Sequence, residues 1–145
     1  MPACTFFGHR ECYGLDREKL REAIELLIYK GIDEFFVGNQ GGFDAMVHTC
    51  LKQLSVKYPH IRYCVVLAYL PGQRREYEDL SDAIYPEGLE IGLPKFAVER
   101  RNRWMIERAD CCLCYINHTW GGAYKFGKAA KHRGLAVINM GNVRI

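Results

Sequence analysis

Short apolar runs alternate along this chain with longer amphipathic stretches, which predicts strands that alternate with helices. Residues 16–30 have the spacing of an amphipathic helix, with Asp16 suited to cap its start and Gly31 to follow its end. Further helices are expected at residues 43–57, 94–109 and 123–132. The expected strands are the apolar runs at residues 3–7, 34–37, 61–70, 111–116 and 136–140. This order predicts a doubly wound α/β fold with a mainly parallel five-stranded sheet flanked by helices.

One long stretch, residues 71–93, interrupts this alternation. It contains several prolines and glycines, and two arginines against six acidic residues. A loop of this length is a candidate binding loop or lid. Tyr69, Tyr77 and Tyr85 flank it and are candidates to line the same pocket. No repeat or linker-like segment divides the chain, so residues 1–145 are expected to form a single domain.

Composition narrows the class of protein. The chain has 145 residues, of which 49% are hydrophobic and 26% charged, as in ordinary globular proteins and unlike disordered ones. No apolar run approaches the length that crosses a bilayer, and the N-terminus has no basic-then-apolar signal segment. A cytoplasmic location without a membrane partner is therefore expected. The net charge of +3 is too small to indicate a nucleic-acid-binding protein.

The seven cysteines also favour an intracellular protein. Their number is odd, and several lie in strongly apolar runs, which is not the pattern of a disulfide framework. No paired Cys-x2-Cys units are present to bind a metal. The nearest cluster is Cys4, His9 and Cys12, for which burial in the core is a better explanation than a metal site. Neither a metal nor a cofactor is therefore expected.

Glycines follow three of the predicted strands. Gly8 follows the first strand, Gly38, Gly41 and Gly42 follow the second, and Gly121 and Gly122 follow the fourth. The carboxyl ends of parallel strands lie at one edge of the sheet, where ligands bind. Glycine lets the backbone approach a ligand, and the N–H groups of the next helix favour an anion. A single turn of this kind simply tolerates glycine, whereas three at one edge favour a phosphate-bearing ligand.

Charged and aromatic residues near these turns are candidate ligand contacts. Arg10 follows the first turn, and Arg101 lies at the edge of an apolar stripe of its helix, positions suited to bidentate phosphate recognition. Asp44, in the first turn of its helix, is suited to stabilise that helix by its charge, to contact a ribose or to act as a base. His9 is a polar contact or a turn residue, and Trp120 is placed to stack on a base or to pack against its own turn.

Three stretches, taken in order, resemble one known group of proteins. They are residues 5–10 (TFFGHR), residues 38–44 (GNQGGFD), and residues 101–105 (RNRWM) followed by Asp110 and Gly121-Gly122. Together they resemble the SLOG superfamily, the Rossmann-like group that includes DprA and LOG proteins, and most closely its small YpsA-like, DUF1273-type members. The resemblance spans nearly the whole chain. It implies a Rossmann-like fold and an association with nucleotides, nucleotide-derived signals or, in the DprA branch, nucleic acid.

The LOG-type phosphoribohydrolases of this group cleave the N-glycosidic bond of nucleoside monophosphates. Their arginine followed by methionine four residues later is matched by Arg101 and Met105. Their Pro-Gly-Gly-x-Gly-Thr motif and its following glutamate are replaced at residues 120–127 by WGGAYKFG, and no Asp or Glu follows Asp110. Because such hydrolysis needs a carboxylate, only an acid elsewhere in the chain is available for it.

Two functions from different classes are consistent with these patterns. The first is binding, by sensing or sequestration, of a phosphate-containing nucleotide or nucleotide-derived ligand, with phosphate on the turns at Gly8 and Gly121-Gly122. The alternative is an enzyme of N-glycosidic chemistry, a nucleotide phosphoribohydrolase or a deoxyribosyltransferase-like enzyme, that uses Asp44 or Glu99. A nucleic-acid partner is not favoured, and a domain this small is compatible with a homo-oligomer.

Overall fold

Strands and helices alternate in a computed structural model that describes residues 2–69 and 81–145. The strands are β1 (Ala3–Gly8), β2 (Glu34–Val37), β3 (Arg62–Val66), β4 (Ala83–Ile84), β5 (Cys111–Tyr115) and β6 (Ala136–Asn139). The helices are α1 (Arg17–Tyr29), α2 (Gly42–Lys57), α3 (Ala97–Arg108) and α4 (Gly121–Arg133), with a 3-10 helix, η2 (Pro94–Phe96), directly before α3. Neighbouring strands are parallel, in the order β4-β3-β2-β1-β5-β6. The prediction of a doubly wound α/β fold is confirmed.

The sheet has six strands in the described residues, one more than the sequence predicts. The additional strand, β4, lies within the stretch expected to be a loop, where Ala83 and Ile84 pair with Val65 and Val66 of β3. Two residues at the edge of a sheet are too few for a period of alternation to be recognised. Residues 70–80 of that stretch, including Tyr77, lie outside the described residues.

The ends of the helices determine where the candidate ligand residues lie. Asp16 caps α1 as predicted, since its Oδ1 accepts a hydrogen bond from the Glu18 N–H at 2.8 Å. Gly31 follows α1 with a φ of +104°, which glycine adopts readily. The fourth helix begins at Gly121, two residues earlier than predicted, so Gly121 and Gly122 form its first turn.

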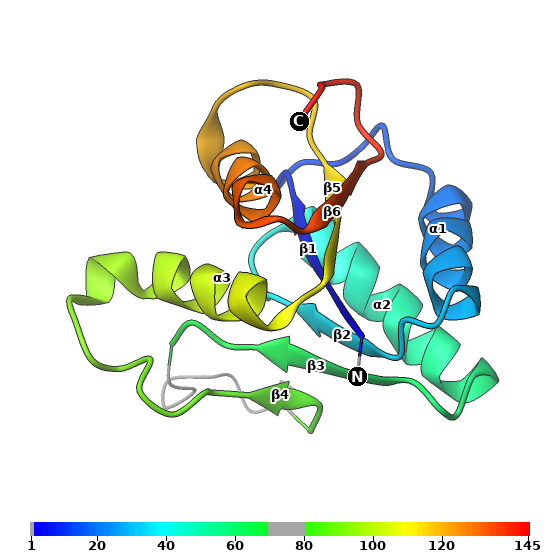
Figure 1. Ribbon diagram of the computed structural model, residues 1–145, viewed down its shortest axis with the longest axis horizontal. Coiled ribbons are helices and arrows are strands. Elements are labelled where there is room, and N and C mark those ends of the chain that lie inside the picture. The colour runs from blue at the N-terminus through cyan, green and yellow to red at the C-terminus, as the bar shows by residue number, and fades with distance from the viewer. Residues whose placement is uncertain (1, 70–80) are drawn as a thin grey trace.

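Alternate residues of the strands face two separate apolar layers. In β1, Cys4 and Phe6 pack against α1 and α2, whereas Ala3 and Phe7 pack toward α3 and α4. Figure 1 shows this arrangement, with α1 and α2 on one face of the sheet and α3 and α4 on the other. Covered strands of this kind are apolar throughout, which is why their positions could be predicted.

The strand order places the candidate site. From β1 the chain moves outward through β2 and β3 to β4, and then returns past β1 to β5 and β6 on the other side. The order therefore reverses between β1 and β5, whose last paired residues are Gly8 and Tyr115. Ligands of doubly wound folds bind outside the carboxyl ends of the strands at such a reversal.

All seven cysteines are free, and six of them are buried, with Cys64 half-buried. Within residues 2–69 and 81–145, no three His, Cys, Asp or Glu side chains are grouped to hold a metal ion. No helix in these ranges is long and apolar enough to cross a membrane.

Candidate functional site

A cavity of about 220 Å³ opens at the carboxyl edge of the sheet, beside the reversal of strand order. It receives residues from the loop after β1, the loop before α2, the inner face of α3 and the first turn of α4. Six of the predicted ligand residues line it: Gly8, His9, Arg10, Asp44, Arg101 and Gly122. A smaller cavity of about 160 Å³, which Asp44 also lines, is lined by Gly38 and Gly41. Gly42, Trp120 and Gly121 line neither of these cavities.

Arg101 is the buried cation of the site, with only 2% of the residue exposed. Its Nε donates to Asn102 Oδ1 at 2.7 Å, and its Nη1 donates to the Val66 carbonyl at 2.9 Å and to Asn39 Oδ1 at 3.4 Å. Within the described part of the chain, Nη2 donates no hydrogen bond. A guanidinium has five N–H donors, and the fold occupies Nε and Nη1, so within the described residues Arg101 keeps only the two N–H groups of Nη2 without an acceptor.

Asp44 lines both cavities and is also buried. Its Oδ2 accepts a hydrogen bond from the Gln40 N–H at 2.9 Å, so the side chain reaches back over the start of its own helix. Burial raises the pKa of Asp44 to about 6, although the Gln40 N–H and the charge of Arg101 both act to lower it. The site therefore holds a carboxyl group whose protonation changes close to neutral pH.

Two glycines of the site leave room for other side chains. A Cβ on Gly38 would lie 2.7 Å from Arg101 Nη1 and 2.9 Å from Asp44 Oδ2. A Cβ on Gly8 would lie 2.2 Å from the ring of Phe43. At these positions glycine is required by packing within the protein, whereas the sequence pattern suggested the approach of a ligand.

The N-terminus of α2 is closed by the protein's own backbone. The Gly42 N–H donates to the Arg10 carbonyl at 2.7 Å, and the Phe43 N–H donates to the His9 carbonyl at 3.4 Å. The preceding Gly41 has a φ of +94°, which lets the chain turn under the loop after β1. Two of the N–H groups that an anion would use at this helix are therefore already bonded.

The N-terminus of α4 is open. Trp120 is its extended N-cap residue and makes no side-chain capping bond, and the first turn contains no acidic residue. In the described chain, the N–H groups of Gly121, Gly122 and Ala123 have no hydrogen-bond acceptor. A Cβ on Gly122 would meet no atom within 4 Å, so this side of the helix faces open space. Free N–H groups at a helix N-terminus attract an anion.

Three aromatic rings form a continuous stack beside this helix. The His9 and His118 rings lie 3.9 Å apart at 16°, and the His118 and Trp120 rings lie 3.8 Å apart at 18°. His9 Nε2 accepts a hydrogen bond from the Asn117 N–H at 2.8 Å. Burial lowers the pKa of His9, and the adjacent His118 lowers it further. The first ring of the stack, which also lines the cavity, is therefore held in its neutral form at neutral pH.

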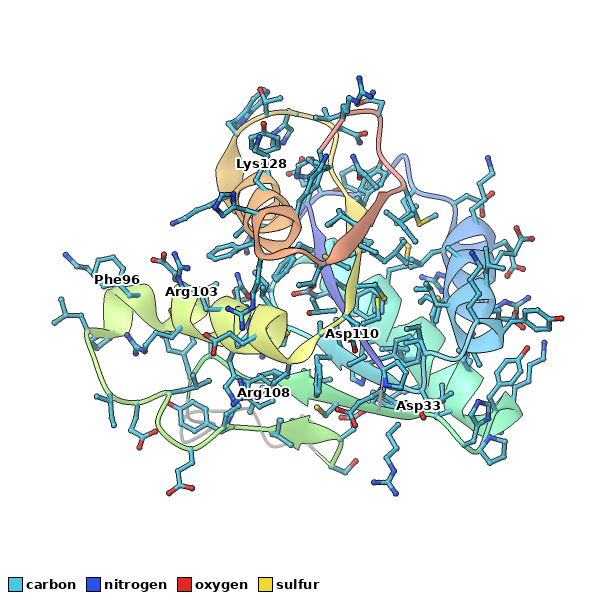
Figure 2. The ribbon with its side chains drawn as sticks, in the orientation of Figure 1. Asp33, Phe96, Arg103, Arg108, Asp110 and Lys128 are labelled. Carbon is cyan, nitrogen blue, oxygen red and sulfur yellow. The ribbon has the colours of Figure 1, made fainter. Side chains whose placement is uncertain are left out.

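Glu99, one of the two acids that the sequence offers for N-glycosidic chemistry, does not line the cavity. Its Oε1 pairs with Arg103 at 2.9 Å and with Lys125 at 3.3 Å. Figure 2 shows Arg103 extending from α3 on the side that faces α4. Glu99 therefore links two helices at the surface and is absent from the lining of the cavity.

Several polar residues of the site were missed by sequence reasoning. Gln40 and Asn102 line the main cavity, and His48 lines the smaller one, where its Nε2 lies 2.6 Å from Asp82 Oδ2. Amide side chains produce no periodic pattern. The only available signal for Gln40 is its place beside Gly41-Gly42, and for Asn102 its place beside Arg101. For His48 the signal was its position one helical turn after Asp44.

Comparison with other proteins adds no relative to this description. A scan of the chain against protein-family models finds no match, and a search of curated proteins finds none. The groups that the site offers to a ligand are the unbonded N–H groups of α4, Nη2 of the buried Arg101, the exposed Arg10 and the carboxyl of Asp44.

Proposed function

We propose that the protein binds a phosphate-containing nucleotide or nucleotide-derived ligand at the carboxyl edge of its sheet. The observation that carries this proposal is the open first turn of α4, which lies at the same cavity as Arg101, whose Nη2 has no acceptor within the described residues. A phosphate accepts hydrogen bonds from backbone N–H groups and is favoured by the helix dipole. Arg101 adds a positive charge and the two N–H groups of Nη2, which can donate charge-assisted hydrogen bonds to phosphate oxygens.

The remaining groups of the cavity suit a sugar phosphate better than a simple anion. Arg10 is exposed at the rim, and its side chain makes no hydrogen bond or ion pair within the described residues, so it is available to a second phosphate oxygen. Asp44 opposes it as an acceptor for a ribose hydroxyl. A carboxylate alone would repel phosphate, but a hydroxyl between the two groups can donate to Asp44. The resemblance to the SLOG superfamily supports the same class of ligand.

A thermal-shift series tests this proposal. Ribose 5-phosphate and AMP should raise the melting temperature at concentrations where adenosine, which has the same base and sugar, does not. The Arg10→Ala variant should lose most of that shift, since it removes a charge-assisted contact from the rim. Arg62→Ala, which removes an exposed arginine from the start of β3 at the opposite, amino edge of the sheet, is the matched control and should keep the shift. An equal shift with adenosine would exclude phosphate as the recognised group.

A second candidate, N-glycosidic cleavage, is favoured by one observation. Asp44 is a buried carboxyl with a pKa of about 6, which is the property of a group that both donates and accepts a proton near neutral pH. In hydrolysis, water oxygen would bond to C1′ while the electrons of the C1′–N bond leave with the base. Protonated Asp44 would give its proton to the leaving nitrogen and regain one from the water.

Chromatography of the same ligands distinguishes the two functions. If AMP or dAMP releases free base in the presence of the protein, and Asp44→Asn stops the release, the protein is an enzyme. Glu99→Gln is the control, because Glu99 pairs with Arg103 and Lys125 and should not affect release. Binding of AMP without release assigns the protein to the sensing or sequestering class.

A further inference from the structure

The cavity is too small for the whole of the proposed ligand. Its volume is about 220 Å³, whereas pockets that enclose a drug-sized ligand measure roughly 300–1,000 Å³. A ribose and one phosphate can occupy such a space, but the base of a nucleotide must then lie outside it. The base therefore needs a flat surface next to the cavity on which it can stack.

The stack of His9, His118 and Trp120 is such a surface. His9 lines the cavity, and the stack leads from it to Trp120, which is 68% exposed. His118 covers one face of the indole, and within the described residues no other ring or cation lies over it. The next two residues, Gly121 and Gly122, carry the unbonded N–H groups of α4. The exposed indole and the proposed phosphate site are therefore adjacent in the chain.

Backbone hydrogen bonds hold the stack in place without a ligand. The Asn117 N–H donates to His9 Nε2, which leaves the proton of the neutral ring on Nδ1. His118 Nδ1 lies 2.9 Å from the Trp120 carbonyl, and because a carbonyl can only accept, this nitrogen carries a proton. Both imidazoles are thus fixed by residues of the β5–α4 loop. A preformed platform reduces the entropy that a ring would lose on binding.

We infer that the base of the bound nucleotide stacks on the exposed face of Trp120, outside the cavity that holds its ribose and phosphate. This inference rests on the proposed function. It also predicts the specificity of the site, since stacking depends on ring area and every base has a π face. Purine nucleotides bind more tightly than pyrimidine nucleotides, and the site discriminates little among purines.

Tryptophan fluorescence tests the inference directly. In a Trp104→Phe background Trp120 is the only tryptophan, because the chain has two. AMP should quench its emission, CMP should quench it less at equal occupancy, and ribose 5-phosphate should bind with no quenching. Binding of ribose 5-phosphate is followed separately by its thermal shift. Saturation with AMP that leaves the emission unchanged would overturn the stacking inference.

The Trp120→Ala variant separates this inference from the proposed function. Removal of one stacking contact should weaken the binding of AMP by about tenfold. The affinity for ribose 5-phosphate should stay within about twofold of its original value. Tyr29→Ala, which removes an aromatic side chain that is 90% exposed at the end of α1, is the matched control. If Trp120→Ala binds AMP as tightly as the original protein, the platform is refuted while phosphate binding stands. If neither ligand binds the original protein, the proposed function fails and the inference fails with it.

Discussion

The two helices that begin at the edge of the cavity, α2 and α4, have similar sequences at their starts but differ in whether their first N–H groups are hydrogen-bonded. Both follow a buried strand and have a Gly-Gly pair at the start, which spans the N-cap and first residue of α2 and the first two residues of α4. At α2 the first N–H groups are taken by the carbonyls of His9 and Arg10, and an acidic side chain lies over the turn. At α4 the corresponding N–H groups have no acceptor in the described chain.

The difference arises from a third segment, the loop after β1. This loop lies across the start of α2, where a Cβ on Gly42 would be 2.6 Å from the Arg10 carbonyl. No segment of the described chain lies over Gly122 in the same way. A glycine pair after a strand therefore identifies the start of a helix. It does not show whether the first N–H groups of that helix are free to bind a ligand, because this depends on which segment packs against them.

The largest expected effect on stability comes from removing the charge of Arg101, which lies close to Asp44 in the first turn of α2. Arg101→Met should lower the free energy of unfolding by about 3 kcal/mol, because the Val66 carbonyl and Asn102 lose a buried donor and Asp44 loses the positive charge that acts to lower its pKa. Urea denaturation measures the change. Arg103→Met, which breaks a surface pair on the same helix, should leave stability nearly unchanged. Equal effects of the two variants would show that the buried contacts of Arg101 stabilise the fold no more than a surface ion pair does.

A smaller effect of opposite sign is expected at Asp44. The folded-state pKa of about 6 lies above the ordinary value of 3.8, so the charged carboxylate destabilises the fold at high pH. Asp44→Asn should therefore raise the free energy of unfolding by about 2 kcal/mol at pH 8. The gain should narrow by about 1 kcal/mol at pH 5, where the folded protein holds the proton and the unfolded chain does not. A gain that is constant from pH 8 to pH 5 would contradict the raised pKa.

The smallest effects compare the two helix starts by the same substitution. Gly42→Ala should lower the free energy of unfolding by about 1 kcal/mol, because the added methyl group meets the Arg10 carbonyl. Gly122→Ala should raise it by about 0.5 kcal/mol, since alanine is the better helix former and its methyl group has open space. Thermal unfolding measures both. The same Gly122→Ala protein should bind AMP more weakly, and unaltered binding would place the phosphate elsewhere.

Much of the fold could be predicted because its strands and helices carry strong apolar patterns. Phe35 and Val37, for example, belong to a short buried strand, and Leu20 and Ile24 repeat at helical spacing in α1. The two-residue strand β4 could not be predicted, because its position depends on hydrogen bonds to β3 and not on a pattern of its own.

The candidate site could be predicted in part. Arg10 and Arg101 could be placed at the cavity because one follows a strand and the other lies beside an apolar stripe. The reason why glycine is needed at these positions could not be predicted. At Gly8 it is the ring of Phe43, which comes from a separate segment of the chain. The stack of His9 on His118 depends in the same way on two loops that are far apart in sequence.

The open space beside Gly122 and the burial of the native thiols together make this protein unusually easy to label at one chosen point. A Gly122→Cys substitution would place a thiol at the first turn of α4, where the helix dipole favours the reactive thiolate. Six of the seven native cysteines are shielded from reagents, and Cys64 is half-covered and has its pKa raised to about 12 by burial. A fluorophore attached there would stand where the phosphate is proposed to bind, so a loss of AMP binding on labelling would locate the ligand at this end of α4.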